Sequence, residues 1–171
     1  LRSETAILQP QNDAFIQSFS FGGTGGDINL VAPIINLGGN AFTLFIGAFG
    51  PGQGGDVNID ADSFQSDVSS IGAVLAAPGN GGQAGSVNIN SDSIFLDEVQ
   101  LISAVVEPGA LGNSGNVNIT TDSLVAINGS LIGSLTAGNG NAGNVTVTAD
   151  TISLSGFRVL SQPLSEPTRI S

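Results

Sequence analysis

A five-residue phrase that recurs five times at a nearly constant interval is the feature that most constrains the fold of this chain. Each copy begins with glycine and carries aliphatic residues at its third and fifth positions. The copies are GDINL from Gly26, GDVNI from Gly55, GSVNI from Gly85, GNVNI from Gly115 and GNVTV from Gly143. A period of about 29 residues is typical of proteins that stack one small structural unit on the next.

Each repeat opens with an alternation of apolar and polar residues, which is the pattern of a β-strand with one buried face. In the second copy, Val57 and Ile59 alternate with Asp56, Asn58 and Asp60. Two shorter alternations follow, and a loop rich in Gly, Asn and Pro closes the repeat. We predict three strands per repeat, with buried columns Ile35/Leu37, Ile94/Leu96, Leu124/Ala126 and Ile152/Leu154 in the second strand, and Phe42, Ile71, Leu101, Leu131, Val159 and Ile46, Leu75, Val105, Leu135 in the third.

These columns distinguish two architectures. Antiparallel hairpins would place the strands of one repeat side by side, with no reason for columns at this period. A β-solenoid stacks each strand on the same strand of the next repeat, so equal positions become neighbours. We therefore predict an all-β, right-handed parallel β-helix (β-solenoid) with about one three-stranded coil per 29-residue repeat. We expect a partial preceding coil over 1–21, about five coils over 22–160 and a linker or cap segment over 161–171.

The composition excludes several kinds of chemistry. The 171 residues include 14 Asp and Glu against three Lys and Arg, without His or Cys, and the net charge is −11. A Ser-His-Asp triad, a thiol nucleophile and an imidazole or thiolate metal site need residues that the chain lacks. The scarcity of cations disfavours nucleic acid and anionic membranes as partners, and no apolar run is long enough to span a bilayer. We expect a non-enzymatic protein with no cofactor.

A column of aspartates, each followed by Ser or Thr, marks the junction of the first two strands. Carboxylates one coil apart are candidate calcium ligands, because Ca²⁺ prefers oxygen donors. Alternatively, each Asp side chain accepts a hydrogen bond from the backbone two residues on and thereby forms a turn. The members of this column are Asp62, Asp92, Asp122 and Asp150.

A second polar column lies within the recurring phrase, between its two aliphatic positions. Because its members alternate with buried residues, we expect them to point outward. A flat polar row of this kind could bind sugars or ordered water, and the alternative is a ladder of side-chain amides between coils. The column consists of Asn29, Asn58, Asn88 and Asn118, with Thr146 in the last repeat.

The third strand differs from the first because its outward positions are also largely apolar. An outward apolar row several coils tall is the kind of patch that marks an interface. The alternative is that a terminal segment, 15–21 or 163–170, folds over it. We predict self-association or a protein partner on this outer face, at Phe45, Val74, Ile102, Ala104, Ile132 and Leu160.

Two segments resemble a known family. GNSGNVNITTDSLVAINGS from Gly112 and GNAGNVTVTADTISLSG from Gly140 resemble the repeat region of bacterial filamentous-haemagglutinin-type exoproteins, which are passengers of two-partner secretion. The resemblance covers roughly 22–156 and implies a right-handed parallel β-helix, export to the cell surface or medium, and adhesion or matrix building. The family's NPNG-type secretion motif and an RGD-like motif are not found in this sequence, so the chain would correspond to a downstream repeat segment.

These features predict a non-enzymatic structural or adhesive segment of a secreted bacterial surface or extracellular-fibre protein. We expect it to assemble through lateral or end-to-end contacts, with surface carbohydrate as a further partner. The alternative is a carbohydrate-binding or carbohydrate-cleaving β-helix of the tailspike or lyase type. A catalytic carboxylate pair would break the repeat, whereas the aspartate column follows it.

Overall fold

The structure, a computed structural model, describes residues 2, 7–8, 15–38, 42–75, 82–105, 111–156 and 158–163. Within these residues there is no helix, and so no helix that could cross a membrane. The strands are β1 (Ile7–Leu8), β2 (Phe15–Ser20), β3 (Ile28–Val31), β4 (Ile34–Leu37), β5 (Phe42–Ala48), β6 (Gly52–Gln53), β7 (Val57–Asp67), β8 (Ser69–Leu75), β9 (Gly82–Gln83), β10 (Val87–Asp97), β11 (Gln100–Val105), β12 (Val117–Ile127), β13 (Leu131–Thr136), β14 (Val145–Leu154) and β15 (Arg158–Pro163).

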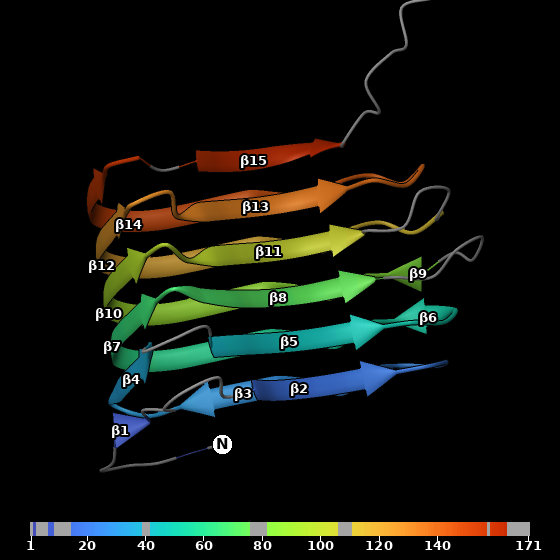
Figure 1. Cartoon of the computed structure of the whole chain (residues 1–171), viewed down its shortest axis with the longest axis horizontal. Coiled ribbons are helices and arrows are strands. Elements are labelled where there is room, and N and C mark those ends of the chain that lie inside the picture. The colour runs from blue at the N-terminus through green and yellow to red at the C-terminus, as the bar shows by residue number, and fades with distance from the viewer. Residues whose placement is uncertain are drawn as a thin grey trace, which may run out of the picture.

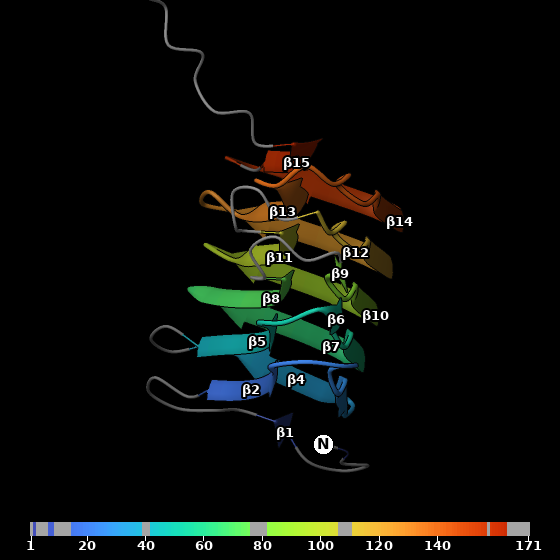
Figure 2. The ribbon, with the colours of Figure 1, turned by 90° about the vertical axis from the view of Figure 1, so that its right-hand side faces the viewer.

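The strands form two main parallel sheets that face each other across a narrow core. Sheet A has the order β1-β4-β7-β10-β12-β14, with β3 also paired to β7, and sheet B has the order β15-β13-β11-β8-β5-β2. A short third sheet, β6-β9, lies at one corner between them. The chain runs along one sheet, turns, returns along the other and climbs by one coil, winding in a right-handed sense (Figures 1 and 2). The predicted β-solenoid is confirmed.

Equal positions of successive repeats lie side by side in sheet A. Val87 pairs with Val57 on one side and Val117 on the other, and Asn88 pairs with Asn58 and Asn118. The aliphatic residues of the recurring phrase point inward and are buried in the core in the first four copies, and they are half-buried in the last copy, at Val145 and Val147. The same holds for the second-strand columns in the first four coils, from Ile35 and Leu37 to Leu124 and Ala126.

The first two strands that we expected in each coil are joined into one. In β7, β10 and β12 each strand runs on through the Asp-Ser position, but the register pairs stop before the aspartate and resume at the serine, and the side-chain alternation changes phase there. Ala61 is buried, Asp62 and Ser63 both face outward, and Phe64 is buried again. Only the first described coil divides into β3 and β4, at Pro33, because proline has no N–H with which to continue the ladder. A coil therefore has two long strands, not three, and the junction is a bend.

The leading glycine of the recurring phrase is required by the closeness of the coils. A Cβ atom on Gly55, Gly85, Gly115 or Gly143 would lie 1.8–2.3 Å from the carbonyl oxygen of the glycine one coil earlier. No side chain fits at that distance, which accounts for glycine at these four positions, whereas a Cβ atom on Gly26 would meet only the Ser18 hydroxyl, at 3.7 Å.

Sheet B corrects part of the predicted third-strand columns. Leu101 pairs with Ile71 on one side and with Ile132 on the other, so that Ile132 is inward and fully buried while Leu131 is only half-buried. Ile71 in turn pairs with Leu44 and not with Phe42. The predicted inward places of Leu131 and Leu135 are therefore wrong, whereas Phe42 pairs with Ser69, one inward position before the row in which it was expected, and its side chain lies outside the described part. Thr136 takes the inward position in place of Leu135.

These shifts arise at the corner that joins sheet A to sheet B. Ile127 still pairs with Asp97, but five positions further on the register has moved by one residue. Gly129, with a φ of 84°, supplies the extra residue in a wider turn. The inward residues of sheet A were predicted correctly because they come before this corner, where the spacing between repeats is constant. Those of sheet B come after the corner, and there the extra residue changes the spacing.

The two ends of the described stack differ in how well the core is covered. β1 and β2 pair with β4 and β5, and they continue both sheets below the first complete coil. At the other end, Ile152 and Leu154 are 51% and 49% exposed, whereas their neighbour Leu124 is 1% exposed. Sheet B extends through Pro163, inside the expected linker or cap segment, and 164–171 lie outside the described residues.

Candidate functional site

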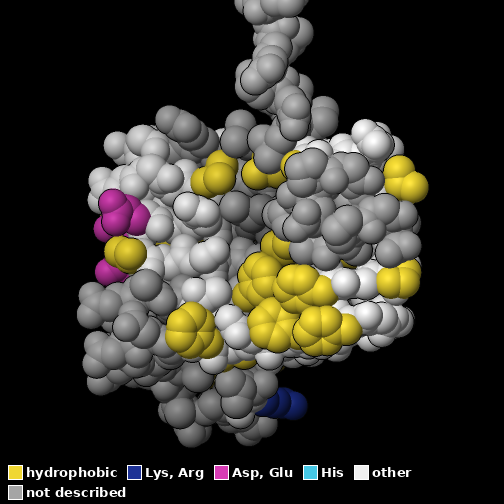
Figure 3. Space-filling view, turned by 45° about the vertical axis from the view of Figure 1, so that its right-hand side comes forward, with side chains coloured by type: hydrophobic (Ala, Val, Ile, Leu, Met, Phe, Trp, Pro, Cys, Tyr) yellow, Lys and Arg dark blue, Asp and Glu magenta, His cyan; other side chains and the backbone are white. Residues whose placement is uncertain are grey.

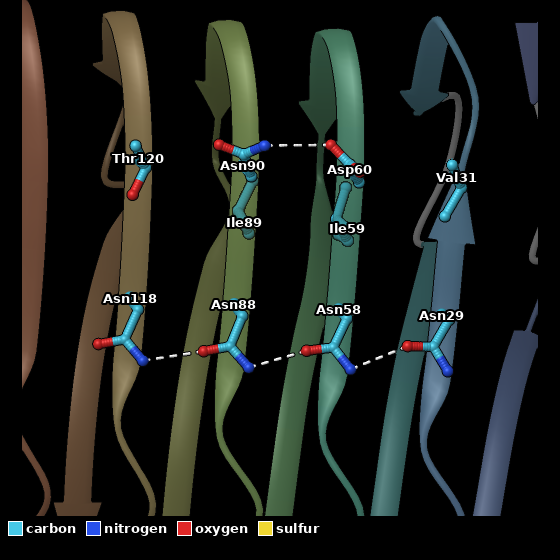
Figure 4. Close-up of a pocket in the computed structure, with 10 residues that line it drawn as sticks. All are labelled: Asn29, Val31, Asn58, Ile59, Asp60, Asn88, Ile89, Asn90, Asn118 and Thr120. Atoms are coloured by element: carbon cyan, nitrogen blue, oxygen red, sulfur yellow. Dashed lines mark hydrogen bonds between the residues drawn. The ribbon is translucent and has the colours of Figure 1, made fainter.

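The outer face of sheet A carries a shallow groove that crosses several coils (Figure 4). Its volume is about 300 Å³. Two rows of side chains, two residues apart along the strands, border it, and the backbone beside Ile59 and Ile89 forms its floor because those side chains point into the core. We call it the asparagine groove. Its rows are Asn29, Asn58, Asn88 and Asn118, and Val31, Asp60, Asn90 and Thr120.

The asparagine row forms a continuous amide ladder. The Nδ2 group of each later residue donates to the Oδ1 atom of the one before it, at 2.9 Å from Asn58 to Asn29, 2.8 Å from Asn88 to Asn58 and 2.8 Å from Asn118 to Asn88. In the second row, Asn90 donates through Nδ2 to Oδ1 of Asp60 at 3.1 Å. The amide ladder that was one interpretation of this column is therefore present, and it fixes the orientation of every amide in the row.

A second ladder, which was not predicted from the sequence, lies two residues before the asparagine row in each coil. The backbone N–H of Asp56 donates to Oδ1 of Asp27 at 2.8 Å, and that of Ser86 donates to Oδ1 of Asp56 at 2.7 Å. The N–H groups of Asn116 and Asn144 continue the pattern onto Ser86 and Asn116. The signal was present in the second position of the phrase, which is always Asp, Ser or Asn. These short side chains accept hydrogen bonds and tie successive coils together.

The aspartate column lies on the outer surface at the bend in sheet A. Asp62, Asp92, Asp122 and Asp150 are exposed, and no hydrogen bond to their carboxylates is found among the described residues. The bend in β12 is instead braced by the Thr121 hydroxyl, which donates to the carbonyl of Ser123 and accepts from its N–H. The described residues contain no group of three His, Cys, Asp or Glu side chains placed to hold a metal ion. The geometry supports neither the calcium site nor the aspartate side-chain turn.

The outer face of sheet B carries an apolar patch (Figure 3), but its members differ from the prediction. Phe45 and Val74 are half-buried on this face, and Ile102, Ala104 and Leu160 occupy the paired register positions, although their side chains lie outside the described part. Ile132 does not belong to it, because the register shift at Gly129 turns that side chain into the core.

Phenylalanine rings dominate this face, and most of them were not predicted. Phe19, Phe21 and Phe49 are 48%, 79% and 43% exposed. The ring centroids are 6.1 Å apart for Phe19 and Phe45, 5.6 Å for Phe19 and Phe49, and 5.7 Å for Phe21 and Phe49. We call these four residues the phenylalanine cluster. The segment 15–21 does not fold over the patch, because 15–20 form β2, the next strand of the same sheet.

Comparisons with protein-family models, with curated proteins and with solved structures give no match. The fold therefore defines the class of this protein, a parallel β-solenoid with an asparagine groove on one face and a phenylalanine cluster on the other. The resemblance to filamentous-haemagglutinin-type exoproteins stays a prediction from the sequence.

Proposed function

We propose that this chain is a non-enzymatic structural and adhesive segment of a secreted bacterial surface or extracellular-fibre protein, and that it associates laterally with further copies. The observation that carries the proposal is the phenylalanine cluster. Aromatic rings in mutual contact on an open surface expose apolar area to water, and contiguous patches of this kind are characteristic of interaction sites.

The surroundings of the cluster favour a flat, uncharged contact. The outward positions of β5 and β8 are Thr43, Phe45, Gly47, Ser70, Gly72 and Val74, none of them charged. A chain with a net charge of −11 repels its own copies, so a charge-free face is the surface on which two of them approach at least electrostatic cost.

The exposed core at the end of the stack supports a second mode of contact, end to end. Ile152 and Leu154 occupy the same columns as buried residues of the preceding coil, yet about half of each side chain faces solvent. Among the described residues β14 is the last strand of sheet A, and a parallel edge with exposed aliphatic residues is suited to receive another strand.

The regular use of polar groups supports a structural role over catalysis. The side chains of the asparagine column and of the second ladder bond to the equivalent residue or backbone one coil away. They stabilise the stack in the same way in successive coils, as a structural element does.

Sedimentation velocity of the double variant Phe45→Ser, Phe49→Ser tests the proposal. We expect the unaltered chain to associate with rising concentration and the double variant to remain a monomer with unchanged β-sheet circular dichroism. Phe95→Ser is the matched control, because Phe95 is an exposed phenylalanine on sheet A, away from the cluster. A chain that stays monomeric at every concentration, or a double variant that associates as before, would contradict the proposal.

A further inference from the structure

We propose that the asparagine groove binds a neutral, extended, β-linked polysaccharide that lies along the solenoid axis with one sugar unit per coil. The inference goes beyond lateral assembly, because the groove is on the outer face of sheet A and the phenylalanine cluster is on the outer face of sheet B, which points the other way (Figure 2). Each site can therefore be occupied, and tested, without the other.

The amide ladder leaves a repeating pair of hydrogen-bonding groups for a ligand. A side-chain amide has two N–H donors and an oxygen with two lone pairs. Asn58 and Asn88 each use one N–H toward the preceding coil and one lone pair toward the following coil. Each of these amides thus retains one donor and one acceptor, which together match a sugar hydroxyl, itself both donor and acceptor.

The spacing of these pairs selects the kind of polymer. Coils of a parallel β-solenoid repeat at about 4.8 Å, so the free donors and acceptors also repeat at about 4.8 Å. An extended β-linked glycan advances by a similar length per sugar unit, and successive units can therefore meet successive amides. An extended peptide advances by about 3.3 Å per residue and loses this match after one coil. The repeat favours a glycan over a protein segment.

The charge of the groove selects a neutral ligand. Among its lining residues only Asp60 is charged, and its Oδ1 atom accepts the bond from Asn90. No Arg lines the groove, and the chain as a whole is strongly acidic. Uronic-acid polymers, sulfated glycans and nucleic acids would meet repulsion from this acidic chain along the groove, because Arg2 pairs with Val31 at the end of the second row and not along it.

The groove is also preorganised. The ladder bonds fix each amide, and the floor is strand backbone over the buried side chains of Ile59 and Ile89. A ligand that binds to groups already held in place avoids the entropic cost of ordering them. Val31 and the methyl group of Thr120 add apolar contact for the C–H faces of the sugar rings.

Isothermal titration of the full chain with cellohexaose, cellotriose and the β-1,4-linked glucuronate hexamer, which differs from cellohexaose in its carboxylates, tests this inference. We expect the neutral hexamer to bind, the trimer to bind at least tenfold more weakly because it reaches fewer amides, and the anionic hexamer not to bind. Equal binding of the anionic hexamer, or no binding of cellohexaose at millimolar concentration, would overturn the inference.

Two substitutions place the ligand in the groove. Asn88→Thr breaks the ladder at its centre with the residue that the chain itself carries at Thr146 in the last coil, and we expect at least a tenfold loss of affinity with native circular dichroism. Thr146→Asn extends the amide row by one coil, and we expect cellohexaose to bind two- to threefold more tightly. A ladder with a purely structural role would change the melting temperature in both variants and leave the affinity unchanged.

The double variant Phe45→Ser, Phe49→Ser separates this inference from the proposed function. We expect it to bind cellohexaose as the unaltered chain does, whether or not the chain associates laterally. Loss of glycan binding in this variant with retention in Asn88→Thr would assign the sugar to the phenylalanine cluster and overturn the groove as its site.

Discussion

Sheet A and sheet B are built by the same coils, yet they differ in how strictly the repeat is kept. In sheet A the identical positions Asn58, Asn88 and Asn118 stand in one row, and each bonds to the next through its side chain. In sheet B the register shifts at Gly129, and Leu44, Ile71, Leu101 and Ile132 fill the inward row with only their apolar character in common. The residue type is constant at positions where a side chain forms a hydrogen bond with the equivalent residue of the next coil. The residue type varies at positions that only need an apolar side chain of suitable shape.

The largest expected effect tests the register of sheet B. Ile132→Lys should destabilise the chain by about 4 kcal/mol or prevent folding, because it places an unpaired charge in the core. Leu131→Lys, one residue earlier and half-buried on the outer face, should cost about 0.5 kcal/mol or less. Urea unfolding followed by circular dichroism measures both. If Leu131→Lys were the more destabilising variant, Leu131 and not Ile132 would point into the core, and the register shift would be contradicted.

The next effect concerns the glycine column that sets the distance between coils. Gly85→Ala should destabilise the chain by about 3 kcal/mol, because the new Cβ atom would lie 1.8 Å from the carbonyl oxygen of Gly55. Gly22→Ala is the matched control, since nothing lies within 4 Å of its Cβ position. Thermal unfolding of the two variants compares them, and equal melting temperatures would show that the coils can move apart.

The asparagine ladder should stabilise sheet A by a moderate amount. Asn58→Leu removes the bonds to Asn29 and Asn88 and should cost about 1–2 kcal/mol. Ser70→Ala is the counterpart on the outer face of sheet B, where the described side chains form no equivalent ladder, and it should cost about 0.5 kcal/mol or less. Chemical denaturation of both variants measures the difference. If the two variants lost the same free energy of unfolding, hydrogen bonds between side chains would not explain why asparagine recurs at this position of sheet A.

The smallest effect is a gain of stability at the corner between the sheets. Val68 has a φ of 43°, in the left-handed region where a β-branched residue is strained, and the equivalent residues Glu98 and Asn128 have φ values of 53° and 52°. Val68→Asn should raise the free energy of unfolding by about 1 kcal/mol, and the reciprocal Asn128→Val should lower it by a similar amount. Urea midpoints of the pair provide the measurement, and a loss of stability in Val68→Asn would contradict the strain.

How much could be predicted from sequence depended on what kept each position constant. The asparagine column was found because it repeats by residue type, and its outward direction followed from alternation with Val57 and Ile59. The phenylalanine cluster was largely missed, because Phe21 and Phe49 occupy equivalent positions in two coils only and Phe19 pairs with Gly47, so no phenylalanine column runs through the repeats. Ile132 was misplaced because a single extra residue at a corner reverses every side chain after it.

The sequence by itself determined the coil, its parallel stacking and the faces of sheet A. In a solenoid equivalent positions of successive repeats are neighbours, so the contacts of sheet A appear in the sequence as residues that recur at a constant interval. Only the tertiary structure decided the register of sheet B, the continuity of strands through the Asp-Ser bend and the gathering of four phenylalanines on one face. Turn lengths and inter-strand contacts are set by how the backbone closes each coil in space, and that closure leaves no regular spacing in the sequence.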